Sequence, residues 1–194
     1  MSYFPIYMNI KNEDKVLLIG GGKVALQKLK VLIDNHIKVH LVAEQVDLSI
    51  YEYLSGYENS ETAVEMELAE YREELLSDDY SFVIAATNDR ELNSRIAAAS
   101  KERNIPVNVV DDPELSTFIF PSIIKRGDLV IGISSSGKAP AVTQYYKERF
   151  AQQLPDNIEE ILEAVGEYRD QIKNDVRDHK KRAAMIRERF LEML

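Results

Sequence analysis

The sequence of 194 residues contains no cysteine, which excludes a disulfide scaffold, a thiolate zinc site and a cysteine nucleophile. It also lacks an apolar run long enough to cross a bilayer, because runs such as Val16–Ile19 and Val130–Ile133 have only the length of a strand. The amino-terminal stretch lacks the basic start and apolar centre of a signal peptide. These absences predict a cytoplasmic protein without a membrane partner.

Positive charge is scarce in the chain as a whole. With 24 Lys and Arg against 33 Asp and Glu, the net charge is −9, which argues against nucleic acid as a partner. The scarcity is confined to residues 1–120, which hold 11 basic and 21 acidic residues, whereas residues 121–194 hold 13 and 12. Such asymmetry is common, but it also fits a second half that meets an anionic ligand.

Residues 15–110 alternate short β-branched runs with helical patterns, which is typical of a parallel sheet covered on both faces. The chain from Lys15 to Ala43 has the length of one βαβ unit. Apolar spacing predicts helices over Lys23–Asn35 and Asp89–Arg103 and one or two helical turns over Tyr71–Leu76. The predicted strands are Lys15–Ile19, Lys38–Ala43, Ala63–Leu68, Tyr80–Ala86 and Ile105–Val110.

The rhythm changes after Val110. Thr117–Phe120 and Asp128–Ser134 resemble strands with no helix between them, so we expect them to form an antiparallel pair. A helix over Ala139–Gln153 should follow, and then helix to the end with a break near Gly166. The fold class is therefore α/β: a Rossmann-type parallel sheet over 1–112, a small β dimerisation module over 113–138 and a helical domain over 139–194.

The clearest motif follows the first strand. Gly20, Gly22 and Ala25 fit the G-x-G-x-x-G/A pattern, in which the first glycine permits a tight turn and the second lets a pyrophosphate approach the backbone. A tight strand-to-helix turn without a ligand is the alternative. The strand before the motif and the helix after it favour dinucleotide binding.

Two acidic residues lie where such a site would need them. Glu44 follows the second strand at the spacing of a ribose-binding acid, and no arginine beside it would accept a 2′-phosphate, so NAD is preferred over NADP. Small residues before Thr87 leave room for the cofactor at the end of the fourth strand. Asp111 follows the fifth strand, after Asn108, where a nicotinamide and its substrate would lie. The alternatives are an unpaired surface acid for Glu44 and a turn-forming aspartate for Asp111.

Other motifs are weaker. The three histidines, His36, His40 and His179, do not have metal-ligand spacing, so no metal site is expected. The loop from Ser134 to Lys138 is similar to a phosphate loop but lacks its first glycine and final hydroxyl, which favours a polar loop that opens the next helix.

Taken together, these motifs resemble the precorrin-2 dehydrogenases of siroheme synthesis. The resemblance covers nearly the whole chain and weakens over the last 45 or so residues. It is carried by Tyr3-Phe4-Pro5-Ile6-Tyr7, Gly20–Ala25, Ile84–Asp89, Asn108–Asp111, Phe118–Ile124 and Ile133–Pro140. The Ser135-Ser136-Gly137 sequence departs from the Ser-Gly-Gly often seen in the family.

The resemblance implies NAD-dependent oxidation of precorrin-2 to sirohydrochlorin by a homodimer in which the middle β module joins the subunits and the helical tail covers the active-site cleft. Asp111 matches the catalytic aspartate of the family. Cofactor contacts are expected at Gly20, Gly22, Lys23, Val24, Glu44, Gln45, Thr87 and Asn108. The polycarboxylate substrate is expected to meet Ser134, Ser135 and Lys138, and Lys125 and Arg126 would add positive charge. Two alternatives are a bifunctional enzyme that also inserts Fe²⁺ and a binding protein without turnover.

Overall fold

The computed structural model describes residues 3–57 and 63–194 and divides the chain into two compact units, Met1–Phe120 and Pro121–Leu194. Residues 1–2, which begin the amino-terminal stretch considered above, lie outside the described residues. No helix in the described part is both long and apolar enough to span a membrane. The three-part division at 112 and 138 stays a prediction, and the two units are described separately.

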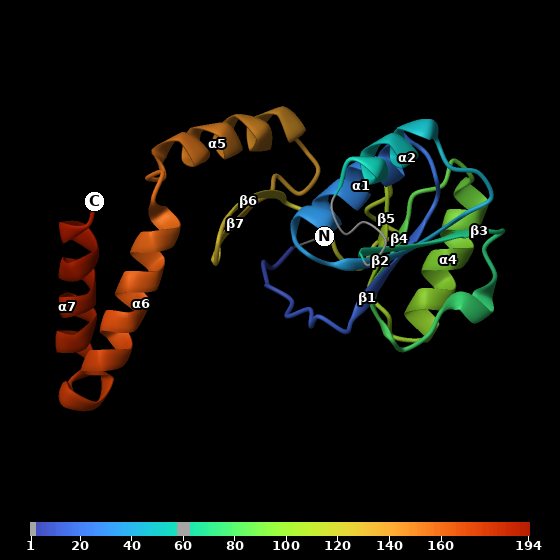
Figure 1. Ribbon diagram of the computed structural model, residues 1–194. Helices are drawn as coiled ribbons and strands as arrows, with labels where there is room; N and C mark the ends of the chain where they lie inside the picture. Colours follow the sequence, from blue (N-terminus) through green and yellow to red (C-terminus); the bar gives the residue numbers. More distant parts are fainter. Residues whose placement is uncertain (1–2, 58–62) are drawn as a thin grey trace. The chain divides into compact units, whose positions relative to one another are not determined.

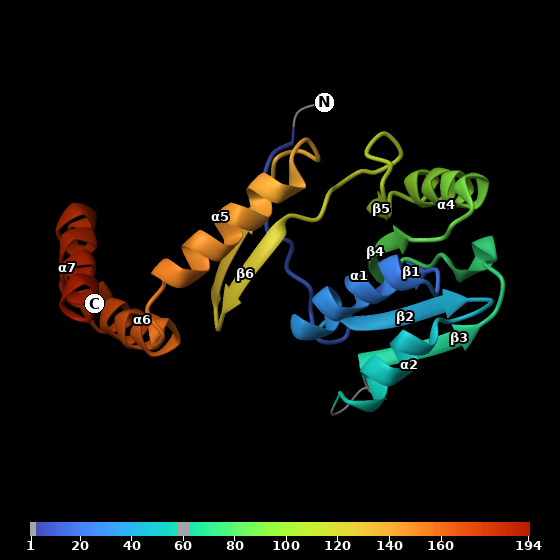
Figure 2. The ribbon, with the colours of Figure 1, turned by 90° about the horizontal axis from the view of Figure 1, so that it is seen from above.

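The first unit is built on a five-stranded parallel sheet in the order β3-β2-β1-β4-β5 (Figures 1 and 2). The strands are β1 (Lys15–Ile19), β2 (Lys38–Ala43), β3 (Val64–Leu68), β4 (Tyr80–Ala85) and β5 (Val107–Val109). The α/β class and the strands predicted within residues 15–110 are confirmed, with ends that differ by at most two residues. The order reverses between β1 and β4, so the loops after these strands border the crevice where open α/β sheets bind ligands.

Helices cover both faces of this sheet, which explains why β1 is apolar at consecutive positions. Val16 and Leu18 pack on the face covered by α1 (Lys23–Asp34) and α2 (Leu48–Ser55). Leu17 and Ile19 pack on the opposite face, under α4 (Arg90–Glu102). All four side chains are at most 2% exposed. The sheet is therefore the centre of a core with two layers, as Figure 1 shows.

Two short helical elements follow β2 and β3. Helix α2 was not expected from the sequence; the side chain of Asp47 begins it by accepting a hydrogen bond from the Ser49 N–H at 2.9 Å. The predicted helical turns at Tyr71–Leu76 are a single 3₁₀ turn, η1 (Glu73–Leu75). Both elements lie near the carboxyl ends of neighbouring strands.

One of the two strands in the predicted antiparallel pair is wrong. The second unit contains β6 (Ser122–Arg126) paired with β7 (Leu129–Ile133), whereas Thr117–Phe120 is not a strand. Thr117 instead donates its N–H to the Val107 carbonyl at 2.8 Å. The rings of Phe118 and Phe120 pack on Phe82, with centroids 5.1 and 5.9 Å away. These aromatic side chains therefore pack against the core of the first unit. Strand β6 begins only after Pro121, which has no N–H to donate.

Three helices complete the second unit: α5 (Pro140–Gln153), α6 (Ile158–Asp175) and α7 (His179–Glu192). The expected break near Gly166 is wrong, because α6 continues through that residue. A glycine inside a helix costs only about 1 kcal/mol, too little to interrupt 18 residues. The break falls before α7, which Asp178 caps by accepting hydrogen bonds from the N–H groups of Lys180 and Lys181.

Candidate functional site

A pocket of about 520 Å³ lies at the carboxyl ends of the central strands of the first unit. It brings together five of the residues predicted to bind a cofactor: Gly20, Gly22, Glu44, Gln45 and Thr87. Its remaining lining residues are Ile19, Gly21, Val42, Ala43, Val46, Asp47, Ala69, Tyr71, Ala86, Asn88, Asp89 and Leu92. An open pocket therefore lies at the crevice predicted from the strand order.

Three successive glycines line this pocket, and an added Cβ atom would meet different surroundings at each of them. Gly20 has φ +123°, and a Cβ there would collide with the Ala86 carbonyl oxygen, so no other residue fits without strain. A Cβ on Gly21 would collide with the Gln45 carbonyl oxygen. A Cβ on Gly22 would meet nothing within 4 Å. The space beside Gly22 is open for a ligand rather than filled by protein.

Helix α1 begins directly beyond this opening. Gly22 is its N-cap residue, no side chain caps it, and its first turn contains no acidic residue. The first N–H groups of a helix carry a partial positive charge and bind phosphates readily. The open space and the uncapped helix start together fit the pyrophosphate of a dinucleotide.

The end of β2 is acidic. Glu44 and Gln45 are exposed on the pocket wall, and Asp47 lies beside them. Hydrogen bonds from Ser49 lower the pKa of Asp47, and the charge of Lys23 acts in the same direction. No lysine or arginine is among the lining residues in the described part of the chain. A ribose hydroxyl would find acceptors here, whereas a phosphate would find no cationic side chain among the described residues that line the pocket; the cation whose charge acts on Asp47 is Lys23.

The loop after β4 is fixed by side-chain hydrogen bonds. The Thr87 hydroxyl donates to Oδ1 of Asn93 at 2.7 Å, and Nδ2 of Asn93 donates to the Thr87 carbonyl at 3.0 Å. Asp89 caps α4 by accepting hydrogen bonds from the Glu91 and Leu92 N–H groups. The loop therefore has a defined shape at the pocket rim, with Thr87 facing the cavity.

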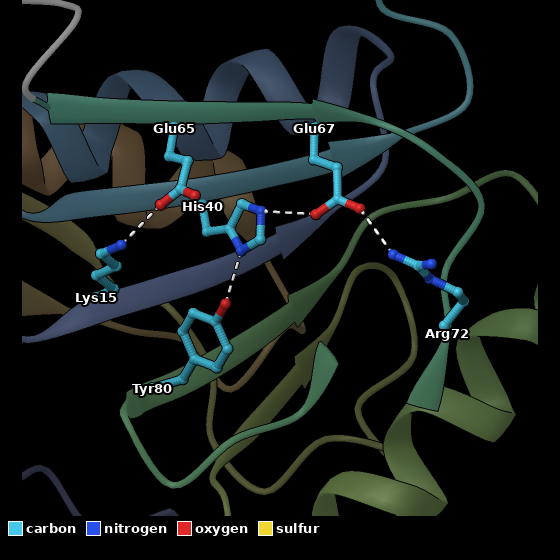
Figure 3. A network of polar contacts seen from close by, with 6 residues as sticks. All are labelled: Lys15, His40, Glu65, Glu67, Arg72 and Tyr80. Atoms are coloured by element: carbon cyan, nitrogen blue, oxygen red, sulfur yellow. Dashed lines mark hydrogen bonds and ion pairs between the residues drawn. The ribbon is translucent and has the colours of Figure 1, made fainter. Parts of the chain in front are cut away.

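A polar network links β2, β3 and β4 (Figure 3). Nε2 of the buried His40 lies 3.2 Å from Oε2 of Glu67, and its Nδ1 lies 2.6 Å from the Tyr80 hydroxyl. The other oxygen of Glu67 accepts a hydrogen bond from Arg72 at 3.0 Å. Glu67 thus contacts both His40 of β2 and Arg72 in the loop after β3, and Tyr71 of the same loop lines the pocket.

Two predicted residues lie at the end of β5, outside the pocket lining. Asn108 is buried, and its Nδ2 donates to the Phe118 carbonyl at 3.1 Å, whereas its Oδ1 has no hydrogen-bond partner in the described part of the chain. Asp111 is exposed and has φ +61°, a conformation that non-glycine residues adopt rarely and that is enriched at functional sites.

The neighbouring aspartate differs from Asp111 in its contacts. Oδ1 of Asp112 accepts a hydrogen bond from the Leu115 N–H at 3.3 Å, and its Oδ2 lies 3.7 Å from Arg90. Among the described residues, the Asp111 carboxylate forms no hydrogen bond or ion pair. Asp112 therefore stabilises the turn before Pro113, and Asp111 keeps its oxygens available.

The structure shows mainly local contacts for the remaining predicted residues. Lys23 and Val24 begin α1 and are exposed, and their side chains do not line the pocket. In the second unit, Ser134 accepts a hydrogen bond from the Ser136 N–H and Ser135 from the Ala139 N–H, both at 3.0 Å. Lys138 ends this loop and donates its N–H to the Ser135 carbonyl. The loop is thus a polar start to α5, as its sequence suggested.

A family model described as putative NAD(P)-binding matches residues 6–122. The chain belongs to this NAD(P)-binding family. A siroheme synthase of Tolumonas auensis is 39% identical over 178 residues, 92% of this chain and 36% of that protein. One of Nitrosomonas europaea is 34% identical over 173 residues, 89% of this chain and 35% of that protein. The chain thus spans little more than a third of the length of these relatives.

The same architecture occurs in a solved structure named SirC, precorrin-2 dehydrogenase. The two chains superpose with a TM-score of 0.62 over 94% of this chain and 88% of that one, at 22% sequence identity. At this identity the match establishes a shared fold. It confirms the predicted combination of a Rossmann-like sheet, a small antiparallel sheet and carboxyl-terminal helices.

A nicotinamide dinucleotide fits the observed groups of this NAD(P)-binding unit. The space beside Gly22 and the start of α1 would hold its pyrophosphate. Glu44 would accept hydrogen bonds from a ribose.

Sequence reasoning missed several residues of the pocket. Asp47 could have been found as an N-cap before an apolar helix. Tyr71 has no local signal, because it reaches the pocket only through the placement of β3 beside β2. Burial raises the pKa of Tyr71, and its hydroxyl has no partner among the described residues. Within those residues, no group of three or more His, Asp or Glu side chains is arranged to hold a metal ion.

Proposed function

We propose that the chain is an NAD-dependent dehydrogenase that oxidises precorrin-2 to sirohydrochlorin. The observation that carries this proposal is the exposed, unpaired carboxylate of Asp111 at the end of β5, on the same sheet edge as the glycine loop. The motifs shared with precorrin-2 dehydrogenases and the similarity to siroheme synthases support the choice of substrate. We propose that its cofactor contacts are Gly20, Gly22, Lys23, Val24, Glu44, Gln45, Thr87 and Asn108, and that its substrate contacts are Ser134, Ser135 and Lys138.

The chemistry requires a base near the hydride acceptor. NAD⁺, held by the glycine loop and Glu44, would supply that acceptor for the two electrons and one proton that leave a carbon of the reduced macrocycle. The resulting cation must then lose a proton, and the Asp111 carboxylate would accept it from the adjacent position. Before that transfer, its negative charge would stabilise the developing positive charge. The products are sirohydrochlorin, NADH and one proton.

The direct test is formation of NADH from NAD⁺ and precorrin-2, followed by absorbance. We expect multiple turnovers with precorrin-2 and none when the macrocycle is omitted. A protein that binds NAD⁺ and the tetrapyrrole without turnover would support the binding-protein alternative.

We propose NAD rather than NADP as the cofactor, because Glu44 stands on the pocket wall and no lysine or arginine of the described chain lines it. Two like charges about 4 Å apart repel by roughly 1 to 4 kcal/mol near a protein surface, so NADP should bind at least about fivefold more weakly. Calorimetric titration with both cofactors measures this difference. Glu44→Gln should reduce the difference in affinity between NAD and NADP. Equal or tighter binding of NADP to the wild type contradicts the proposed preference for NAD.

We further propose a homodimer that uses the Thr117–Ser134 region. Among the described residues, β6 and β7 form a sheet of only two strands, and such small sheets need further partners for stability. Light scattering at micromolar concentrations should give twice the chain mass. A monomer mass across that range excludes the dimer.

A further inference from the structure

Lys28 stands on α1 but does not behave as a surface lysine. Its side chain is half-buried, and its Nζ lies 4.5 Å from the centroid of the Phe120 ring. Phe120 packs with Phe118 against the core on the α1 face of the sheet. The segment after β5 therefore folds back under the Lys28 ammonium group.

The carboxylate of Asp111, the proposed base, acts electrostatically on this ammonium group. Burial lowers the pKa of Lys28, and among the described residues the charge of the Asp111 carboxylate opposes this shift. The two groups do not form an ion pair within 4 Å in the described part of the chain. The Asp111 carboxylate is therefore near enough to act on the Lys28 ammonium group, but the two do not pair.

Val110, the residue before Asp111, packs against the same core cluster as Phe118 and Phe120, so the end of β5 lies on the face of the sheet that α1 covers. The Lys28 ammonium has three N–H donors, and none makes a hydrogen bond to the described protein. A ligand, rather than the protein, is left to use them.

We propose that Lys28 binds a carboxylate of the tetrapyrrole beside Asp111 and so sets which part of the macrocycle faces the base. This inference rests on the proposed function. A polycarboxylate approaching residues 1–120, where acidic residues outnumber basic ones by 21 to 11, needs a local cation to offset repulsion. A partly desolvated lysine forms a stronger charge-assisted hydrogen bond than a fully solvated one.

The test compares three variants of α1. Lys28→Met removes the charge but keeps an unbranched chain over Phe120, and Lys28→Arg keeps the charge. Lys30→Met is the matched control, because Lys30 lies on the same helix with its Nζ 4.9 Å from the Tyr53 ring, but is exposed. For each, we would measure the Kd for sirohydrochlorin by absorbance titration, the KM for precorrin-2, the Kd for NAD and the Tm.

Lys28→Met should weaken sirohydrochlorin binding and raise the KM by roughly 10- to 100-fold, as expected for a lost hydrogen bond to a charged group. Its Kd for NAD and its Tm should stay near wild type. Lys28→Arg should recover most of the affinity, and Lys30→Met should match the wild type throughout.

Two results would overturn the inference in distinguishable ways. If the wild type binds and oxidises the tetrapyrrole and Lys28→Met does so equally well, Lys28 has no role in substrate binding. The same follows if Lys28→Met loses NAD affinity or Tm in parallel with tetrapyrrole affinity. If the wild type neither binds nor oxidises a tetrapyrrole, the proposed function fails and the inference fails with it.

Discussion

Gly22→Val should abolish dinucleotide binding and leave a folded protein. Gly22 has φ −92° and ψ −172°, a backbone conformation that suits valine. A Cβ there meets nothing within 4 Å, so the fold itself has room for the side chain. That room is the proposed path of the pyrophosphate, and filling it also obstructs the N–H groups at the start of α1.

The expected loss of NAD affinity is roughly 100-fold or more, since overpacking and the lost phosphate contacts act together. Calorimetric titration measures the affinity, and circular dichroism with thermal melting checks the fold. Gly166→Val is a matched control, because a Cβ at Gly166 in α6 also meets nothing within 4 Å. It should bind NAD as the wild type does. Unchanged NAD binding by Gly22→Val would place the pyrophosphate elsewhere.

The parts of the fold that the sequence predicts correctly are those specified by neighbouring residues. β1 is a continuous run of buried apolar residues, and α1 has apolar side chains at helical spacing, so each is recognisable alone. Helix α2 was missed because it has eight residues, of which only Ile50 is buried. Its clearest signal is the cap at Asp47.

The errors arise where distant contacts outweigh local preference. Thr117–Phe120 has the composition of a strand, but its aromatic side chains find a better environment against Phe82 than in a hairpin. Gly166 lowers helix propensity, but α6 buries Ile161 and Ile172 on either side of it. In both places tertiary packing decides the outcome.

The residues of the candidate site also divide into those with a local sequence signal and those that distant contacts bring into place. The glycine loop is a local motif, so Gly20 and Gly22 could be named from the sequence. Tyr71 reaches the pocket only because β3 pairs with β2. Lys28 gains its position because residues 118–120 fold back onto α1. A single sequence without strand order or packing carries no signal for either residue.

Asp111→Asn should lose most dehydrogenase turnover and keep its affinity for NAD. Asparagine has the size of aspartate and tolerates the φ of +61°, but it cannot accept the proton. Loss of a general base typically lowers the rate by about 10² to 10⁴. Asp111→Ala should show at least the same loss, with added strain because alanine adopts positive φ less readily. The measurements are kcat with precorrin-2, the Kd for NAD and the Tm of each variant.

Asp112→Ala is the control, because Asp112 belongs to the same turn but uses its carboxylate in contacts with Leu115 and Arg90. Removing those contacts should lower the free energy of unfolding by about 1 kcal/mol and leave kcat near wild type. If Asp111→Asn turns over at the wild-type rate, Asp111 is not the base. If Asp112→Ala alone is inactive although folded, the base is Asp112, and the exposed, unpaired carboxylate of Asp111 has another purpose.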